Sequence, residues 1–130
     1  MVGRPRRWDD PVVRAALKSL VFLPEPSTLP DDPAAFAFEA ELGCGPSDGP
    51  GEEVFGLTVC TGEWLAARCA EQGGVFDARH HLVVAYEGFD EHRLRHWLEA
   101  RVSAATGGTW SEVAEELAKT GRWELDTHNA

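Results

Sequence analysis

Two stretches in the first half of the chain alternate apolar with polar or small residues, which is the pattern of a half-buried strand. In residues 36–42 the polar positions are Glu39 and Glu41, and in residues 53–60 the apolar ones include Phe55, Leu57 and Val59. The segment Gly43–Glu52 between them holds four glycines and two prolines, a composition typical of a turn. We therefore predict an antiparallel hairpin with one wet, acidic face.

Two stretches further on have the period of an amphipathic helix. Thr61 and Asp90 are N-cap residues for helices that begin just after them, and Gly73 and Gly74 end the first of these helices near residue 72. Gly107 and Gly108 turn the chain after the second. The apolar stripes are Trp64, Leu65 and Cys69 in the first helix and Leu94, Trp97, Leu98 and Val102 in the second.

A third helix and a short strand close the chain. Thr109 and Glu112 have the spacing of a capping box at the start of this helix. Gly121 stands where a left-handed glycine commonly ends a helix, and residues 123–126 then alternate like a strand. The stripe that we expect in the core is Trp110, Val113, Ala114 and Leu117, joined by Trp123 from the strand.

The remaining segments complete an α+β prediction. Residues 11–22 fit a helix that begins at Asp10 and Pro11, and they fit a strand equally well by alternation. Prolines make residues 23–33 a surface connection, and His81–Tyr86 predicts an interior strand. We expect a basic flexible tail over residues 1–10 and a single α+β domain over residues 11–130, mainly an antiparallel sheet with three helices and a short C-terminal strand.

Charge narrows the classes of partner. The formal net charge is −10 at pH 7, although the first eighteen residues are basic. An acidic body is repelled by nucleic-acid phosphate and suits a basic protein partner, although acidity also serves solubility alone. The chain has no apolar run of the ~20 residues that a membrane span needs, no signal-peptide pattern, and three cysteines without a CxxC pair. We expect a cytoplasmic protein that does not bind membranes or nucleic acid.

Histidines and cysteines are the first candidates for chemistry. His92 and His96 have metal-ligand spacing, but Arg93 stands where the zinc-protease motif needs a glutamate, so we interpret both as surface residues. Alternation places His80 and His81 on opposite faces. Cys60 and Cys69 have no obvious base nearby in the sequence. These patterns predict no metal site and no cofactor.

Carboxylates are the second candidates. Glu39, Glu41, Glu52 and Glu53 crowd the predicted hairpin, but no aromatic residue that would form a pocket lies between them. A solvated acidic face explains this group better than a catalytic pair. The glycine-rich turn lacks the lysine of a phosphate-binding loop. We therefore predict that the protein is not an enzyme.

The chain resembles the immunity protein 8 family. The matching motifs are F-x-F at residues 36–38, G-E-E-x-F-x-L-x-V-C-T-x-x-W-L at 51–65, R-H-x-L-V-V at 79–84, and T-W-x-E-V-A-E-x-L-x-x-x-G-x-W-E-L at 109–125. The resemblance spans roughly residues 14–126, and the last motif is its most specific part. It implies that Arg14–Phe22 is a strand. The extension Met1–Asp10 is not part of the family pattern.

The resemblance also implies a function. Members are small cytoplasmic proteins of bacterial polymorphic toxin and contact-dependent systems, which bind a cognate toxin domain. For this acidic chain the expected partner is a basic toxin domain, for which a nuclease is one candidate. The hypothesis for the contact surface is Glu39, Glu41, Glu52, Glu53, Glu124 and Asp126. The alternatives are an acidic scaffold that binds an endogenous basic protein and, less favoured, a small-molecule-binding domain or enzyme with a pocket lined by Cys60 and His81.

Overall fold

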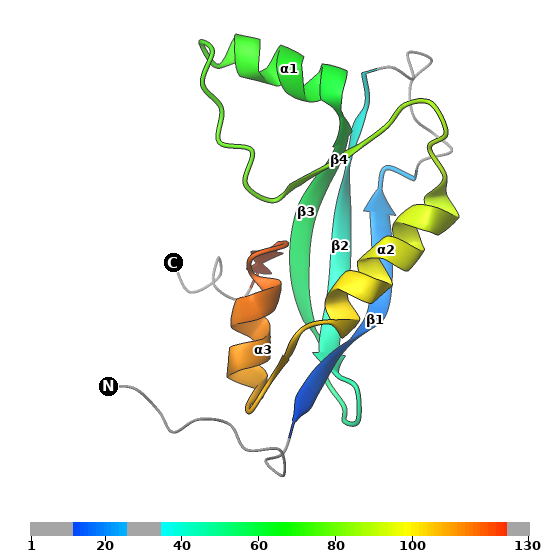
Figure 1. The fold of residues 1–130 in the computed structure, drawn as a ribbon, viewed down its shortest axis with the longest axis vertical. Helices are drawn as coiled ribbons and strands as arrows, with labels where there is room; N and C mark the ends of the chain where they lie inside the picture. Colours follow the sequence, from blue (N-terminus) through cyan, green and yellow to red (C-terminus); the bar gives the residue numbers. More distant parts are fainter. Residues whose placement is uncertain (1–11, 26–34, 125–130) are drawn as a thin grey trace.

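The computed structural model describes residues 12–25 and 35–124. Three long strands form the centre of the fold: β1 (Val13–Leu23), β2 (Ala37–Pro46) and β3 (Glu53–Thr61). They pair antiparallel in this order, so residues 36–42 and 53–60 form the predicted hairpin and the first segment is a strand (Figure 1). The α+β class with a mainly antiparallel sheet and three helices is confirmed.

Short strands cover parts of both edges of the sheet. Along β3, the parallel strand β4 (His81–Val84) pairs with residues 58–61 and the antiparallel strand β6 (Arg122–Trp123) pairs with residues 55–56. On the opposite edge, β5 (Thr106–Gly107) pairs with the start of β1. The prediction of an interior strand at His81–Tyr86 is wrong, because β4 pairs with β3 alone and lies at the edge. An apolar run indicates a strand but does not count its neighbours.

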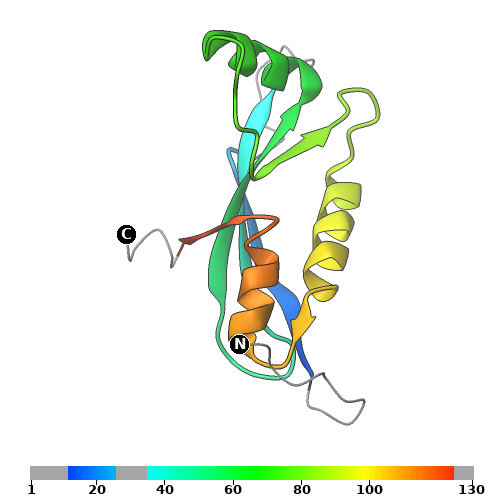
Figure 2. The ribbon, with the colours of Figure 1, turned by 60° about the vertical axis from the view of Figure 1, so that its left-hand side comes forward.

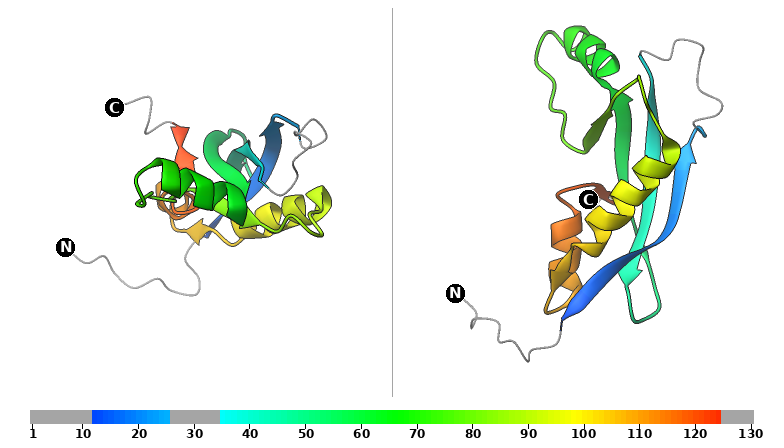
Figure 3. Two further views of the ribbon diagram at one scale, coloured as in Figure 1. Left: turned by 90° about the horizontal axis from the view of Figure 1, so that it is seen from above. Right: turned by 45° about the vertical axis from the view of Figure 1, so that its right-hand side comes forward.

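The helices are distributed unequally over the sheet. Helices α2 (Glu91–Ser103) and α3 (Trp110–Leu117) lie on one face, as the rotated views in Figures 2 and 3 show. Helix α1 (Gly62–Glu71) lies at one end of the sheet and buries no residue fully. None of the helices in the described ranges is long and apolar enough to cross a membrane.

The core lies between the sheet and helices α2 and α3. The predicted stripe of α3 is confirmed, since Val113, Ala114 and Leu117 are buried. The predicted stripe of α2 is wrong for Trp97, whose exposed fraction is 47%. The buried residues of α2 follow one another at intervals of four and so define one helix face, while Trp97 lies on the flank of that face. These buried residues are Leu94, Leu98 and Val102.

Close contacts explain the roles of two glycines, Gly45 and Gly121, for which the sequence pattern predicts a turn and a left-handed helix end. Strand β2 continues through Gly45 instead of entering the turn at Gly43. A Cβ atom on Gly45 would lie 2.0 Å from the carbonyl oxygen of Gly51, so only glycine fits there. Gly121 does not adopt a left-handed conformation. It is buried, and a Cβ atom on it would lie 3.2 Å from the Cβ atom of Phe55, so its role is close packing of the chain against β3.

The capping box of α3 is present with one change. The Thr109 hydroxyl accepts a hydrogen bond from the backbone N–H of Glu112 at 3.2 Å. The Glu112 carboxylate in turn accepts from the N–H of Gly108 at 2.6 Å rather than from that of Thr109. The predicted tail over residues 1–10 lies outside the described residues, as do Asp126 and most of the proline-rich connection.

Candidate functional site

The sheet face that points away from α2 and α3 has no helix over most of its length in the described part of the chain, and we call it the open face. Alternation along the strands decides what it presents: on β2 it turns Phe38 into the core and Glu39 outward. Helix α1 covers only one end of it. Its exposed side chains are Ser19, Val21 and Leu23 on β1, Glu39 and Glu41 on β2, Val54 on β3, and Glu52 and Arg122 beside them, and Thr58 and Glu124 are half-buried on the same face.

Glu39 and Glu41 form the acidic centre of the open face. Glu39 lies opposite Leu23 and Thr58, and its Oε1 atom accepts a hydrogen bond from the Thr58 hydroxyl at 2.6 Å. Glu41 lies opposite Val21 on one side and a glycine on the other. Within the described ranges neither carboxylate has an ion-pair partner, so both keep their charge available to a partner.

Glu52 and Glu124 also lie at the open face, but they are held by neighbours. The Ser19 hydroxyl lies 3.3 Å from Glu52 Oε2, and the Glu52 side chain lies over Gly43, where a Cβ atom would be only 2.7 Å from that oxygen. Glu124 lies 3.6 Å from an Arg122 nitrogen, which offsets part of its charge. The acidic character of the open face therefore comes mainly from β2.

Glu53 does not share the open face with Glu39, Glu41 and Glu52, with which the sequence pattern groups it. It is half-buried on the helix side, where its Oε2 atom accepts hydrogen bonds from the indole N–H of Trp110 at 3.3 Å and of Trp123 at 3.0 Å. This carboxylate thus ties α3 and β6 to β3. Successive residues at the start of a strand point to opposite faces, and this separates Glu53, the first residue of β3, from Glu52. Asp126 lies outside the described residues.

At the end of the open face next to α1 lies a groove of about 380 Å³, which we call the α1 groove. Its polar walls come from Glu39 and Thr58 of the sheet, Trp64 and Arg68 of α1, and His81 of β4, above an apolar floor. The Trp64 ring stacks on His81 with ring centres 6.1 Å apart. No short sequence motif predicts this group, because its members lie on four separate elements.

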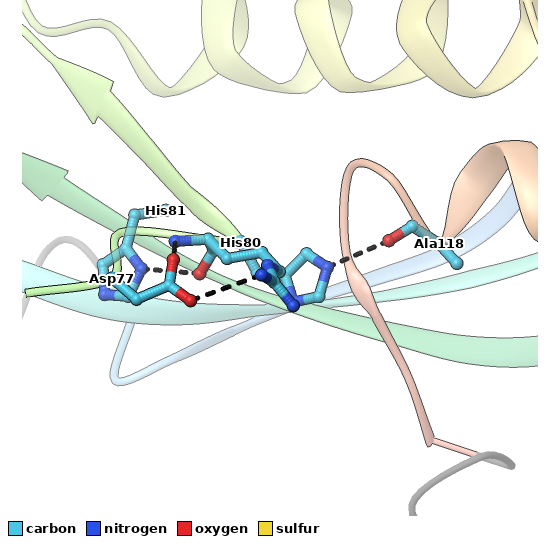
Figure 4. A network of polar contacts seen from close by, with 5 residues as sticks. Asp77, His80, His81 and Ala118 are labelled. Atoms are coloured by element: carbon cyan, nitrogen blue, oxygen red, sulfur yellow. Dashed lines mark hydrogen bonds and ion pairs between the residues drawn. The ribbon is translucent and has the colours of Figure 1, made fainter.

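His80 and His81 point in different directions, as expected (Figure 4), although His80 precedes β4 and has a left-handed backbone with φ of 61°. The His81 ring nitrogen Nδ1 lies 2.9 Å from the carbonyl oxygen of Arg79, at the side of the α1 groove. The His80 ring turns away, and its Nε2 atom lies 2.9 Å from the carbonyl oxygen of Ala118, just after α3. His80 therefore connects the start of β4 to the end of α3 and does not line the α1 groove.

The remaining candidates for chemistry show features of structural or surface residues. His92 and His96 are exposed on α2, and no group of three metal-ligating side chains occurs among the described residues. Burial, with a smaller contribution from the nearby Glu52 charge, raises the pKa of the Cys44 thiol from 9.0 to about 12. Burial also raises the pKa of Cys60. Both thiols are therefore poor nucleophiles near neutral pH, and Cys60 does not line the α1 groove.

The comparisons with known proteins agree with the sequence motifs. The family model described as immunity protein 8 matches residues 17–128, which is most of the chain. Searches of curated proteins and of solved structures found no match.

Proposed function

Because the chain belongs to the immunity protein 8 family, we propose that it protects its producer by binding a cognate toxin domain and covering that domain's active cleft with the open face. Family membership supports an immunity role in toxin systems in general. The choice of the open face, the basic character of the partner and the mechanism of occlusion are our proposal.

The observation that carries this proposal is the composition of the open face. Two carboxylates that have no ion-pair partner among residues 12–25 and 35–124, Glu39 and Glu41, lie beside three apolar side chains whose exposed fractions are 43% for Val21, 48% for Leu23 and 37% for Val54. Sheets usually bury both faces or leave one polar, so an uncovered face with apolar and acidic residues side by side suits a protein contact.

The charge of the chain indicates which toxins fit. A net charge of −10 speeds association with a basic protein and disfavours an acidic one. A nuclease is one candidate, because a cleft that binds phosphate is basic. Occlusion needs no catalysis by the immunity protein: the open face only has to exclude the substrate from the cleft.

The test is protection and binding with charge-reversed variants. The toxin domain encoded beside this protein is expressed with the wild-type chain, with Glu39→Lys/Glu41→Lys, or with the control Glu99→Lys/Glu115→Lys, whose exposed glutamates lie on α2 and α3. Both variants change the net charge equally. We expect the open-face variant to lose about 100-fold or more in affinity and to lose protection, as for charge pairs buried in an interface, while the control keeps both.

Each other outcome has a defined meaning. Equal losses in the two variants would show that only the overall charge matters. If the wild-type chain and the open-face variant protect equally well, the contact lies elsewhere and the immunity role is unaffected. A wild-type chain that neither binds nor protects would refute the proposed function for this toxin and favour binding of an endogenous basic protein.

A further inference from the structure

The α1 groove carries an inference of its own, because its lining combines an aromatic face with hydrogen-bond acceptors. We propose that it binds the guanidinium group of an arginine side chain. For the source of that arginine the inference rests on the proposed function, since the groove adjoins the open face through Glu39 and would receive an arginine of the toxin domain. The chemistry of the groove itself is independent of that function.

Two acceptors in the groove are without a hydrogen-bond partner among the described residues. Glu39 uses Oε1 for the Thr58 hydroxyl, which leaves Oε2 free. The Nδ1 atom of His81 lies 2.9 Å from a carbonyl oxygen, which only accepts, so Nδ1 carries the proton. In the neutral ring Nε2 is then an acceptor. A ligand with several N–H donors matches both atoms.

The Trp64 ring at the side of the groove favours a ligand whose hydrogen-bond donor group is flat. Trp64 is half-buried, stacks on His81 and lines the groove. The face of an indole ring attracts cations, and guanidinium is both flat and rich in donors, so it stacks on the ring while its edge donates to a carboxylate. A lysine ammonium lacks this flat shape. An arginine side chain therefore uses the Trp64 face and the Glu39 oxygen together.

Arg68 is the one cationic side chain among the described residues that line the groove, and it raises a competing hypothesis, in which the groove binds an anion. Its guanidinium carbon lies 5.8 Å from the centre of the Phe76 ring, and one nitrogen lies 3.5 Å from Glu71. Its charge is therefore partly engaged by Glu71 of α1 and by Phe76 in the segment after α1. An anion in the groove would also face the Glu39 carboxylate, so we favour the cation.

The first experiment titrates the full chain with blocked arginine, acetyl-arginine methylamide, and follows the Trp64 indole and His81 ring signals by NMR. Blocked citrulline has nearly the same shape without the charge. We expect saturable shifts with arginine, in the range of about 10 mM, and at least fivefold weaker binding of citrulline. Equal binding of the two compounds would overturn recognition of charge, and shifts without saturation would overturn the site.

Variants assign the contact. Glu39→Gln keeps an acceptor for Thr58 and should weaken arginine binding at least fivefold, while Glu99→Gln on α2 should leave it unchanged. Trp64→Leu should weaken it similarly, and the variant should stay folded because α1 buries no residue fully. Arg68→Gln should leave arginine binding equal or stronger. Saturable binding of blocked aspartate that is lost in Arg68→Gln would instead show an anion site and overturn the proposal.

A second arm separates this inference from the proposed function. Glu39→Gln and Trp64→Leu should each reduce affinity for the toxin domain at least tenfold. If blocked arginine binds but toxin affinity is unchanged in both, the toxin's arginine does not use the groove, whereas occlusion by the open face still stands if Glu41→Lys weakens the complex. If the toxin domain does not bind at all, the proposed function fails, and the titration alone decides the chemistry of the groove.

Discussion

Glu52 and Glu53 are neighbours in the sequence, yet they face opposite sides of the same hairpin. Glu52 lies at the open face, where its carboxylate contacts the Ser19 hydroxyl and lies over Gly43. Glu53 lies on the helix side and accepts from two indole N–H groups. The same type of side chain is thus a surface charge at position 52 and a structural hydrogen-bond acceptor at position 53. Charge alone does not separate surface carboxylates from structural ones in this protein; the face of the strand does.

The comparison extends to the two faces of the whole sheet. The helix side buries Phe55, Leu57 and Val59 of β3 to an exposed fraction of 2% or less, whereas Val54 on the open face is 37% exposed. Apolar residues on the helix side are therefore expected to determine stability. Residues on the open face remain available for binding, and substitutions there should separate affinity from stability.

The largest contrast is expected between Phe55→Ala and Val54→Ala, which are adjacent on β3. Phe55 is 1% exposed and stacks on Trp123, so its truncation should cost about 3–5 kcal/mol in the free energy of unfolding. Val54→Ala should cost less than about 1 kcal/mol. Urea denaturation of both variants measures the difference, and similar losses would contradict the division of the sheet into a core face and an open face.

A smaller contrast is expected between Glu53→Ala and Glu52→Ala, which change the net charge equally. The first leaves the half-buried indole N–H groups of Trp110 and Trp123 without their carboxylate acceptor and should cost about 1–3 kcal/mol. The second removes a weak exposed contact and should change stability by at most about 0.5 kcal/mol. Thermal or urea unfolding measures both. A harmless Glu53→Ala would show that water replaces the carboxylate.

Cys44, which is buried near the end of β2, is expected to lower the stability of the fold at alkaline pH. Because the pKa of Cys44 is raised from 9.0 to about 12, the folded state keeps the thiol proton over a range in which the unfolded state releases it. Stability from this residue is unchanged below pH 9 and falls by about 1.4 kcal/mol per pH unit above it, until the folded thiol also ionises. The unfolding free energies of the wild type and of Cys44→Ala are measured from pH 8 to 11, and the difference between them should show this slope. A difference that does not change with pH would contradict the prediction.

A small effect on stability is expected for Glu39→Lys/Glu41→Lys. Both side chains are exposed and without ion pairs among the described residues, and the variant removes the Thr58–Glu39 hydrogen bond, so the free energy of unfolding should change by no more than about 1 kcal/mol. The same urea measurement serves as the folding control for the affinity experiment. A loss above about 1.5 kcal/mol would mean that the open face contributes to folding and would confound the binding result.

The sequence by itself determined features that depend on neighbours along the chain. The Thr61 and Asp90 caps accept hydrogen bonds from the backbone N–H groups of their first turns, as predicted. The hairpin and the buried stripe of α3 also agree with the pattern, because alternation and helical period report which side of an element is apolar. The first strand was ambiguous from periodicity, and only the family resemblance selected it correctly.

The tertiary structure decided what lies next to each of those sides. The edge position of β4, the exposure of Trp97 and the close packing of Gly121 against Phe55 all depend on elements distant in the sequence. The hydrogen bonds from two indoles to Glu53 and the α1 groove likewise depend on elements distant in the sequence. Periodicity specifies the side of an element on which a residue lies, but long-range packing specifies whether that side meets another element or water, and so separates the carboxylates that stabilise the fold from those that can bind a partner.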